Sequence, residues 1–192
     1  MLIPNFFYKP LMANRITIFR ALLVPVFVTA IVYAQEQNGW NHWIALFVFI
    51  TACLTDAVDG YIARSRNEQT LLGQILDPIA DKLLLISAFL CLFFSSHISI
   101  KPPAWVVILV VTRDLFILAG IVVIYMTTGT WRAQPSLLGK VTTASQMITI
   151  LALLIPLPAA PSFWRVTAIL TLASGLSYLW REVHRIKEYA VR

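Results

Sequence analysis

Charged residues are scarce in this sequence. Lys, Arg, Asp and Glu make up 12% of the 192 residues, whereas soluble globular domains average about 25%. Hydrophobic residues make up 59%. This imbalance excludes an ordinary soluble protein and predicts an integral membrane protein. The length leaves room for one membrane domain and for no sizeable soluble one.

Other absences exclude further classes of protein. Cys53 and Cys91 are the two cysteines, and both lie in apolar runs, which predicts buried side chains rather than a disulfide. His42, His97 and His184 are expected at the surface, and no two of them are spaced to share a metal ion. No basic cluster alternates with aromatic residues, so a nucleic-acid partner is not expected, and the net charge of +6 indicates cytoplasmic loops and anionic lipid. The N-terminus lacks the pattern of a cleaved signal peptide, so nothing is expected to be removed.

Apolar runs predict an all-α integral membrane protein with six transmembrane helices in one domain, residues 1–192. Residues 1–13 mix aromatic residues with Lys9 and prolines, which predicts a short interfacial segment on the membrane surface, with a disordered tail as the alternative. Lys and Arg are concentrated on one side, so both termini are expected to be cytoplasmic. The expected spans are about 14–34, 40–63, 73–94, 104–126, 137–157 and 163–179.

Four aspartates lie close together in a sequence that has only nine acidic residues. Asp56 and Asp59 are three apart, and Asp77 and Asp81 are four apart, so each pair projects from one face of a helix. If the two helices pack antiparallel across the short polar turn between them, the two acidic faces meet. Four facing carboxylates repel unless a cation lies among them. Oxygen ligands alone favour Mg²⁺ or Mn²⁺, and two such ions can clamp a phosphoryl group.

The residues next to the acids agree with a phosphate site. Gly60 and Ala63 are small enough to let a substrate approach, and Arg64 offers a guanidinium to a phosphate. Salt bridges on solvated helix ends are the alternative interpretation of the four acids. That alternative is weaker here because ionisable residues within membrane-like segments are costly and usually functional.

Further polar residues interrupt other spans. Asn14, Thr17 and Arg20 are three apart and form a polar stripe, which either snorkels at the interface or points inward; we favour inward for Asn14 and Thr17. Arg113 and Asp114 interrupt the fourth span and are expected to face the bundle interior. They form either a helix-to-helix ion pair or part of an acceptor-binding site.

The acidic stretch resembles the signature of the CDP-alcohol phosphotransferase family, the CDP-alcohol phosphatidyltransferases, at every fixed position. It reads Asp56-x2-Asp59-Gly60-x2-Ala63-Arg64-x8-Gly73-x3-Asp77-x3-Asp81. The resemblance also covers the start of the first span, the pair in the fourth span and the start of the fifth span, namely Asn14-x2-Thr17-x2-Arg20, Arg113-Asp114 and Gly139-Lys140.

The resemblance implies a six-helix membrane enzyme, usually a homodimer. Such an enzyme uses two divalent cations, Mg²⁺ or Mn²⁺, while an alcohol displaces CMP from a CDP-linked donor. It implies that Asp56, Asp59 and Asp77 are metal ligands and that Asp81 either completes the second ion's shell or acts as general base. The residues that it assigns to CDP binding are Asn14, Thr17, Gly60, Ala63, Arg64 and Gly73.

Two subgroups that use CDP-diacylglycerol compete for the acceptor. Phosphatidylglycerophosphate synthases, which accept glycerol 3-phosphate, usually have Glu, Arg and Lys where this sequence has Asp114, Ile121 and Thr142. A phosphomonoester acceptor needs dedicated cations, and two expected ones are missing. Cardiolipin synthases of the eukaryotic type accept phosphatidylglycerol and have a similar Arg-Asp pair, so phosphatidylglycerol is the favoured acceptor and glycerol 3-phosphate the alternative. The candidate acceptor-binding residues are Arg113, Asp114, Arg132 and Lys140.

Two other classes of function compete with the enzyme. An ion pathway or transporter would also carry acids inside the membrane, but it would place polar groups along the whole depth of the bundle. Here the outer halves of the predicted spans are apolar. An inactive assembly subunit is disfavoured because the full signature is intact.

Overall fold

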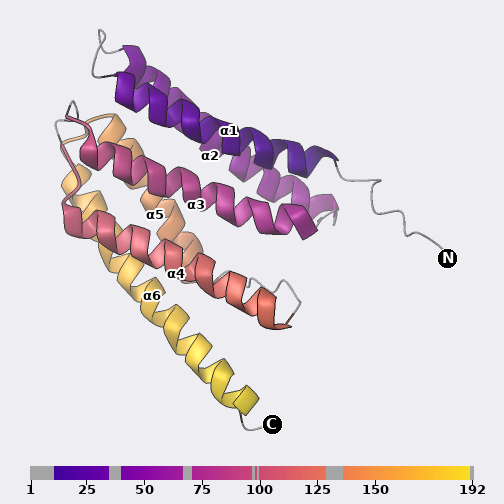
Figure 1. Cartoon of the computed structure of the whole chain (residues 1–192). Helices are drawn as coiled ribbons and strands as arrows, with labels where there is room; N and C mark the ends of the chain where they lie inside the picture. Colours follow the sequence, from indigo (N-terminus) through magenta and orange to yellow (C-terminus); the bar gives the residue numbers. More distant parts are fainter. Residues whose placement is uncertain are drawn as a thin grey trace.

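The computed structural model describes residues 11–34, 40–66, 71–96, 98, 100–128 and 136–190, and in some helical stretches it describes the backbone alone. Within these ranges every regular element is an α-helix, as predicted. Consecutive helices run in opposite directions through one bundle (Figure 1). The six helices are α1 Leu11–Tyr33, α2 Trp40–Arg66, α3 Leu71–Phe94, α4 Ala104–Thr128, α5 Leu137–Leu154 and α6 Ala160–Ala190.

The helices follow the predicted spans with differences at the ends. α1 begins at Leu11, inside the expected interfacial segment, and residues 1–10 lie outside the described residues. α5 ends earlier than predicted, where the N–H of Ile155 donates to the carbonyl of Leu151 at 2.9 Å. α6 continues to Ala190, so the basic stretch after Leu179 prolongs the last helix instead of forming a separate tail.

One described helix, Leu137–Leu154, is long and apolar enough to cross a membrane by length and composition. Two shorter stretches, Phe19–Tyr33 and Asn41–Asp56, are also apolar. This finding covers the described residues alone, so the remaining spans are still predictions.

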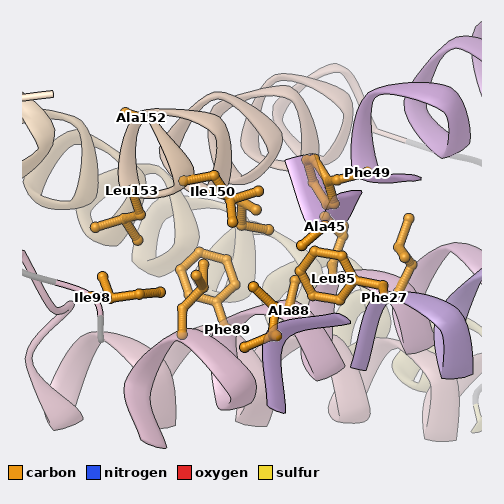
Figure 2. Packing of buried hydrophobic residues seen from close by; sticks show 14 of the residues in the cluster. Phe27, Ala45, Phe49, Leu85, Ala88, Phe89, Ile98, Ile150, Ala152 and Leu153 are labelled. Atoms are coloured by element: carbon orange, nitrogen blue, oxygen red, sulfur yellow. The ribbon is translucent and has the colours of Figure 1, made fainter. Parts of the chain in front are cut away.

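An apolar core joins α1, α2, α3 and α5 (Figure 2). Phe27 of α1 and Phe49 of α2 pack with ring centroids 5.8 Å apart, at an interplanar angle of 51°. Leu85 of α3 and Ile150 of α5 are also fully buried in this core. Inside a membrane bundle such side chains stabilise by close van der Waals packing, so these residues help to fix how the helices face one another.

The connections after α1 and α5 lie at the end of the bundle opposite the acidic stretch. Asn41 donates its side-chain amide to the carbonyl of Tyr33 at 2.9 Å and so satisfies the end of α1. His42 is half-buried and its Nε2 contacts the carbonyl of Leu154. The expectation that His42 is a surface residue was therefore wrong, because the end of α5 packs against the start of α2.

Candidate functional site

Each of the first three helices has a stripe of side chains that faces its neighbours and ends in a charged residue. The spacing of four, three and four residues keeps each stripe on one face of its helix. The apolar members are buried or half-buried in the core, and the charged member lies at the end of the stripe nearest the turn between α2 and α3 (Figure 1). The stripes are Arg20, Val24, Phe27 and Ile31 on α1, Ala45, Phe49, Ala52 and Asp56 on α2, and Asp81, Leu85, Ala88 and Leu92 on α3.

The three charged residues meet in an ion-pair cluster. Arg20 Nη1 lies 3.0 Å from Asp56 Oδ1, and the same nitrogen also donates to Asp81 Oδ1. The Arg20 side chain is 2% exposed, whereas those of Asp56 and Asp81 are 35% and 26% exposed. One guanidinium on α1 therefore joins an acid from α2 to an acid from α3, and these are one acid from each of the two half-sites expected from the spacing.

The cluster suits a divalent cation. Its ligand atoms are carboxylate oxygens, which Mg²⁺ and Mn²⁺ prefer. The two acids carry two negative charges and Arg20 one positive charge, so the described part of the cluster keeps an excess negative charge. Asp56 and Asp81 are partly exposed while Arg20 is buried, so both carboxylates keep free surface for an ion and its phosphate ligand.

Several predicted site residues lie on the same helices, but their side chains are outside the described residues. For this reason no group of three potential metal ligands is found within the described part of the chain. By backbone position, Asn14 and Thr17 belong to the first turns of α1, Asp59, Gly60, Ala63 and Arg64 to the last turns of α2, and Gly73 and Asp77 to the first turns of α3.

A second charged cluster surrounds Asp114 on α4. The Asp114 side chain is fully buried, and its Oδ1 accepts from Arg113 Nη1 at 2.6 Å and from Lys82 Nζ at 3.0 Å. Arg113 also donates from Nη2 to Ser174 Oγ on α6 at 2.5 Å. The prediction that Arg113 and Asp114 face the interior is confirmed, and one of their two interpretations, the ion pair between helices, is present.

Lys82 is a residue of this cluster that the sequence analysis did not single out. It follows Asp81 directly on α3, and its Nζ lies 3.3 Å from Thr143 Oγ1 on α5 as well as near Asp114. A lysine within an apolar run is costly unless it finds a partner inside the bundle. That cost was a signal available in the sequence, but the sequence could not identify Asp114 as the partner.

The start of α5 lies beside Arg113. Ser136 caps α5 by accepting from the Gly139 N–H at 3.0 Å, and a Cβ added at Gly139 would lie 3.5 Å from Arg113 Nη2. Lys140 is exposed and Arg132 lies outside the described residues. The structure thus brings Arg113, Asp114 and the start of α5 together, while it leaves the placement of Arg132 undescribed.

Apolar side chains continue along the three stripes from the ion-pair cluster of Arg20. Phe27, Phe49 and Leu85 are each 0% exposed. Buried polar side chains continue along the contact between α5 and α6, among them Thr149 and Thr167.

The chain matches a known protein family over most of its length. The family model described as CDP-alcohol phosphatidyltransferase matches residues 10–180. The chain is 33% identical over 181 residues to a probable phosphatidylglycerophosphate synthase of Mycobacterium tuberculosis, covering 91% of this chain and 83% of the relative. It is 32% identical to CDP-diacylglycerol--glycerol-3-phosphate 3-phosphatidyltransferase of Bacillus subtilis, and the match covers 91% of this chain and 96% of that relative. It is 34% identical to a probable cardiolipin synthase (CMP-forming) of Drosophila melanogaster, covering 91% of this chain and 58% of that relative.

Proposed function

The chain belongs to the CDP-alcohol phosphatidyltransferase family, and we propose that it transfers the phosphatidyl group of CDP-diacylglycerol to a hydroxyl of a glycerol-type acceptor, releasing CMP. The convergence of Asp56 and Asp81 on Arg20 carries this proposal. It brings the first and last acids of the family signature to one place. The product would be an anionic glycerophospholipid.

Family members are membrane proteins, and we propose that residues 1–192 form one membrane domain in which all six helices cross the bilayer. Large apolar side chains that point away from the bundle support this, among them Phe47, Phe116 and Ile169, which are 72%, 65% and 67% exposed. Such side chains are expected where a helix faces lipid. The proposal includes the interfacial segment 1–13, cytoplasmic termini, a site that opens to the cytoplasm, and a homodimer.

Family members depend on divalent metal ions, and Asp56, Asp59, Asp77 and Asp81 are the proposed ligands for two of them, Mg²⁺ or Mn²⁺. When bound, these ions would neutralise the donor's pyrophosphate and the charge that spreads over the phosphoryl oxygens. Asp81 either shares in holding an ion or accepts the proton of the attacking hydroxyl. The CDP moiety is assigned to residues on the neighbouring turns of α1, α2 and α3, namely Asn14, Thr17, Gly60, Ala63, Arg64 and Gly73.

The acceptor is proposed to bind near Arg113, Asp114, Arg132 and Lys140. Phosphatidylglycerol remains the favoured acceptor because Thr142 replaces an expected lysine, and its buried hydroxyl donates within the α5–α6 contact to the carbonyls of Leu138 and Leu170. Glycerol 3-phosphate is the second candidate, and the names of the similar proteins support both acceptors equally. Arg113, although bound to Asp114, is the proposed cation for the phosphate of either acceptor.

The test is CMP release by the detergent-purified protein from CDP-diacylglycerol, with Mg²⁺ or Mn²⁺, and with each acceptor in a separate reaction. We expect EDTA to abolish release and added metal to restore it. Asp56→Ala and Asp81→Ala should each abolish release. Thr55→Val should preserve it, because the Thr55 hydroxyl donates only to carbonyls of its own helix, at 2.9 Å.

The lipid product identifies the acceptor. Product with phosphatidylglycerol alone establishes cardiolipin synthesis, and product with glycerol 3-phosphate alone establishes the second candidate. Near-normal turnover by Asp81→Ala would overturn the role of that residue. Absence of CMP with both acceptors, from protein that is folded and inserted, would contradict the proposed function.

A further inference from the structure

Two neighbouring residues of α3 point to different sets of helices. Successive residues of an α-helix are rotated by about 100° about its axis. Asp81 accordingly contacts Arg20 of α1, whereas Lys82 contacts Asp114 of α4 and Thr143 of α5. The acid at the candidate metal site and the lysine beside it are thus held by different neighbours on two sides of the same helix.

The contacts of Lys82 lie inside the bundle. Its side chain is 12% exposed and that of Asp114 is 0% exposed. Asp114 Oδ1 accepts from both Lys82 and Arg113, while Asp114 Oδ2 has no hydrogen-bond partner among the side chains that the structure describes. Removing the lysine therefore leaves a fully buried carboxylate with one cation fewer. Breaking a buried pair in this way is much costlier than losing a surface ion pair.

The Asp114 partner is itself anchored to another helix. Arg113 bonds both Asp114 and Ser174 of α6. Lys82 thereby links α3 to a network that spans α4, α5 and α6, whereas Asp81 links α3 to α1 and α2 through Arg20. α3 is the element through which these two halves of the bundle are joined by charged contacts.

The rotation of α3 decides where the Asp81 carboxylate lies. A rotation of about 20° moves a group about 5 Å from the helix axis by nearly 2 Å. Misplacement by about 1 Å can cost about a hundredfold in rate. Asp81 is partly exposed, whereas Asp114 is fully buried on α4 and cannot move without breaking its other bonds, so the Lys82–Asp114 pair restrains this rotation from a fixed point.

We propose that Lys82 is a positioning residue for Asp81: its ion pair with Asp114 fixes the rotation of α3, and this aims the Asp81 carboxylate at the candidate metal site. The inference rests on the proposed function, in which Asp81 holds an ion or accepts a proton. Lys82 acts through Asp81, and its ammonium, already engaged by Asp114 and Thr143, does not contact substrate.

The experiment compares Lys82→Met with wild type in two measurements. Mn²⁺ binding to the detergent-purified protein is measured from the EPR signal of the free ion, and CMP release is measured as kcat and as KM for each substrate. We expect Lys82→Met to weaken Mn²⁺ binding and to lower kcat, each by about 10–100-fold, as is usual when a supporting residue behind a metal ligand is lost. The fall in kcat should exceed any change in the KM for the acceptor, because Lys82 itself makes no contact with substrate and reaches the acceptor site only through Asp114.

Two matched variants separate positioning from general loss of stability. Lys82→Arg keeps a cation for Asp114 and should restore part of the Mn²⁺ affinity. Thr167→Val removes the contacts of Thr167 with Ser145 Oγ at 2.5 Å and Thr149 Oγ1 at 2.8 Å, between α5 and α6. It should lower the melting temperature and leave Mn²⁺ affinity unchanged.

If Lys82→Met does not fold, Lys82→Met combined with Asp114→Asn removes both charges together and should recover folded protein that still binds Mn²⁺ weakly. Wild-type Mn²⁺ affinity in either variant would overturn the proposal. So would a raised KM for the acceptor with kcat intact, which would make Lys82 an acceptor ligand. If wild type binds Mn²⁺ but releases no CMP, the proposed function fails, and the Mn²⁺ comparison still decides the role of Lys82.

Discussion

Arg20 carries a full positive charge into a site built from acids. A buried guanidinium is stable only when carboxylates compensate for its lost hydration, and Asp56 and Asp81 do so from two different helices. Its planar fork can engage more than one oxygen, which the compact ammonium of a lysine does less well. Arg20 therefore serves as an internal counter-charge that lets the two acids approach each other.

Arg20→Met is expected to destabilise the fold and to impair the site. We expect the free energy of unfolding to fall by about 2 kcal/mol. This is less than the roughly 3–5 kcal/mol lost when a fully buried ion pair is broken, because both acids are partly exposed. CMP release should fall at least about tenfold, because the acids lose their common partner. Chemical denaturation in detergent and the CMP assay measure the two effects.

Arg165→Met is the matched control for that prediction, because Arg165 is exposed on α6. It should change the free energy of unfolding by less than about 0.5 kcal/mol. If Arg20→Met were as stable and as active as Arg165→Met, the counter-charge role of Arg20 would be wrong.

At the scale of the elements, α4 and α6 approach closely at a glycine. A Cβ added at Gly120 of α4 would clash with the hydroxyl of Tyr178 on α6. A Cβ added at Gly175 of α6 would lie at ordinary contact distance, 3.8 Å, from Arg113 Cγ. Small residues at helix contacts allow backbones to come close inside a membrane bundle, and Gly120 fits that pattern.

These two glycines provide a matched pair of substitutions. Gly120→Ala should destabilise the protein by about 1–3 kcal/mol, because Tyr178 has to move out of a packed position. Gly175→Ala should be neutral or stabilising by up to about 1 kcal/mol, because alanine favours the helix and its Cβ comes no closer than ordinary contact with Arg113. Thermal unfolding of the two variants in the same detergent measures the difference, and equal melting temperatures would show that the α4–α6 contact is looser than the structure has it.

At the scale of the whole molecule, the two charged clusters lie about midway along their helices, on two sides of α3. Arg20, Asp56 and Asp81 form one cluster and Lys82, Arg113 and Asp114 the other. Under the proposed function, the nucleotide donor would approach from the side of the turn between α2 and α3, while the acyl chains would remain in the lipid around the bundle.

This arrangement predicts a sidedness that can be measured in intact cells. In a background with Cys53→Ser and Cys91→Ser, Lys101→Cys should react with a membrane-impermeant maleimide added outside. Lys140→Cys should react only after the membrane is opened, because the proposed topology puts it on the cytoplasmic side. Both lysines are exposed in the structure, so burial does not explain a difference. External labelling of both positions, or of Lys140→Cys alone, would contradict the proposed orientation.

The sequence by itself determined the helices and the faces that carry the acids. The 3.6-residue period fixes which side chains share a face, so the spacing of Asp56, Asp59, Asp77 and Asp81 was enough to predict two acidic half-sites. The apolar runs located six helices to within a few residues at most ends. α6 was predicted too short because its last turns are charged and show no apolar period.

Only the tertiary structure decided which charges meet. Arg20 and Asp81 are 61 residues apart, and Lys82 and Asp114 are 32 apart. Contacts over such separations depend on how each helix is rotated against its neighbours, and the packing of the apolar core together with the buried charged contacts sets that rotation. The sequence could therefore show that Lys82 and Arg20 needed partners inside the bundle, because a lone charge there is too costly. The sequence could not identify Asp114 as the partner of Lys82. Nor could it identify Asp56 and Asp81 as the partners of Arg20, because no period within a single helix encodes the rotation of its neighbour.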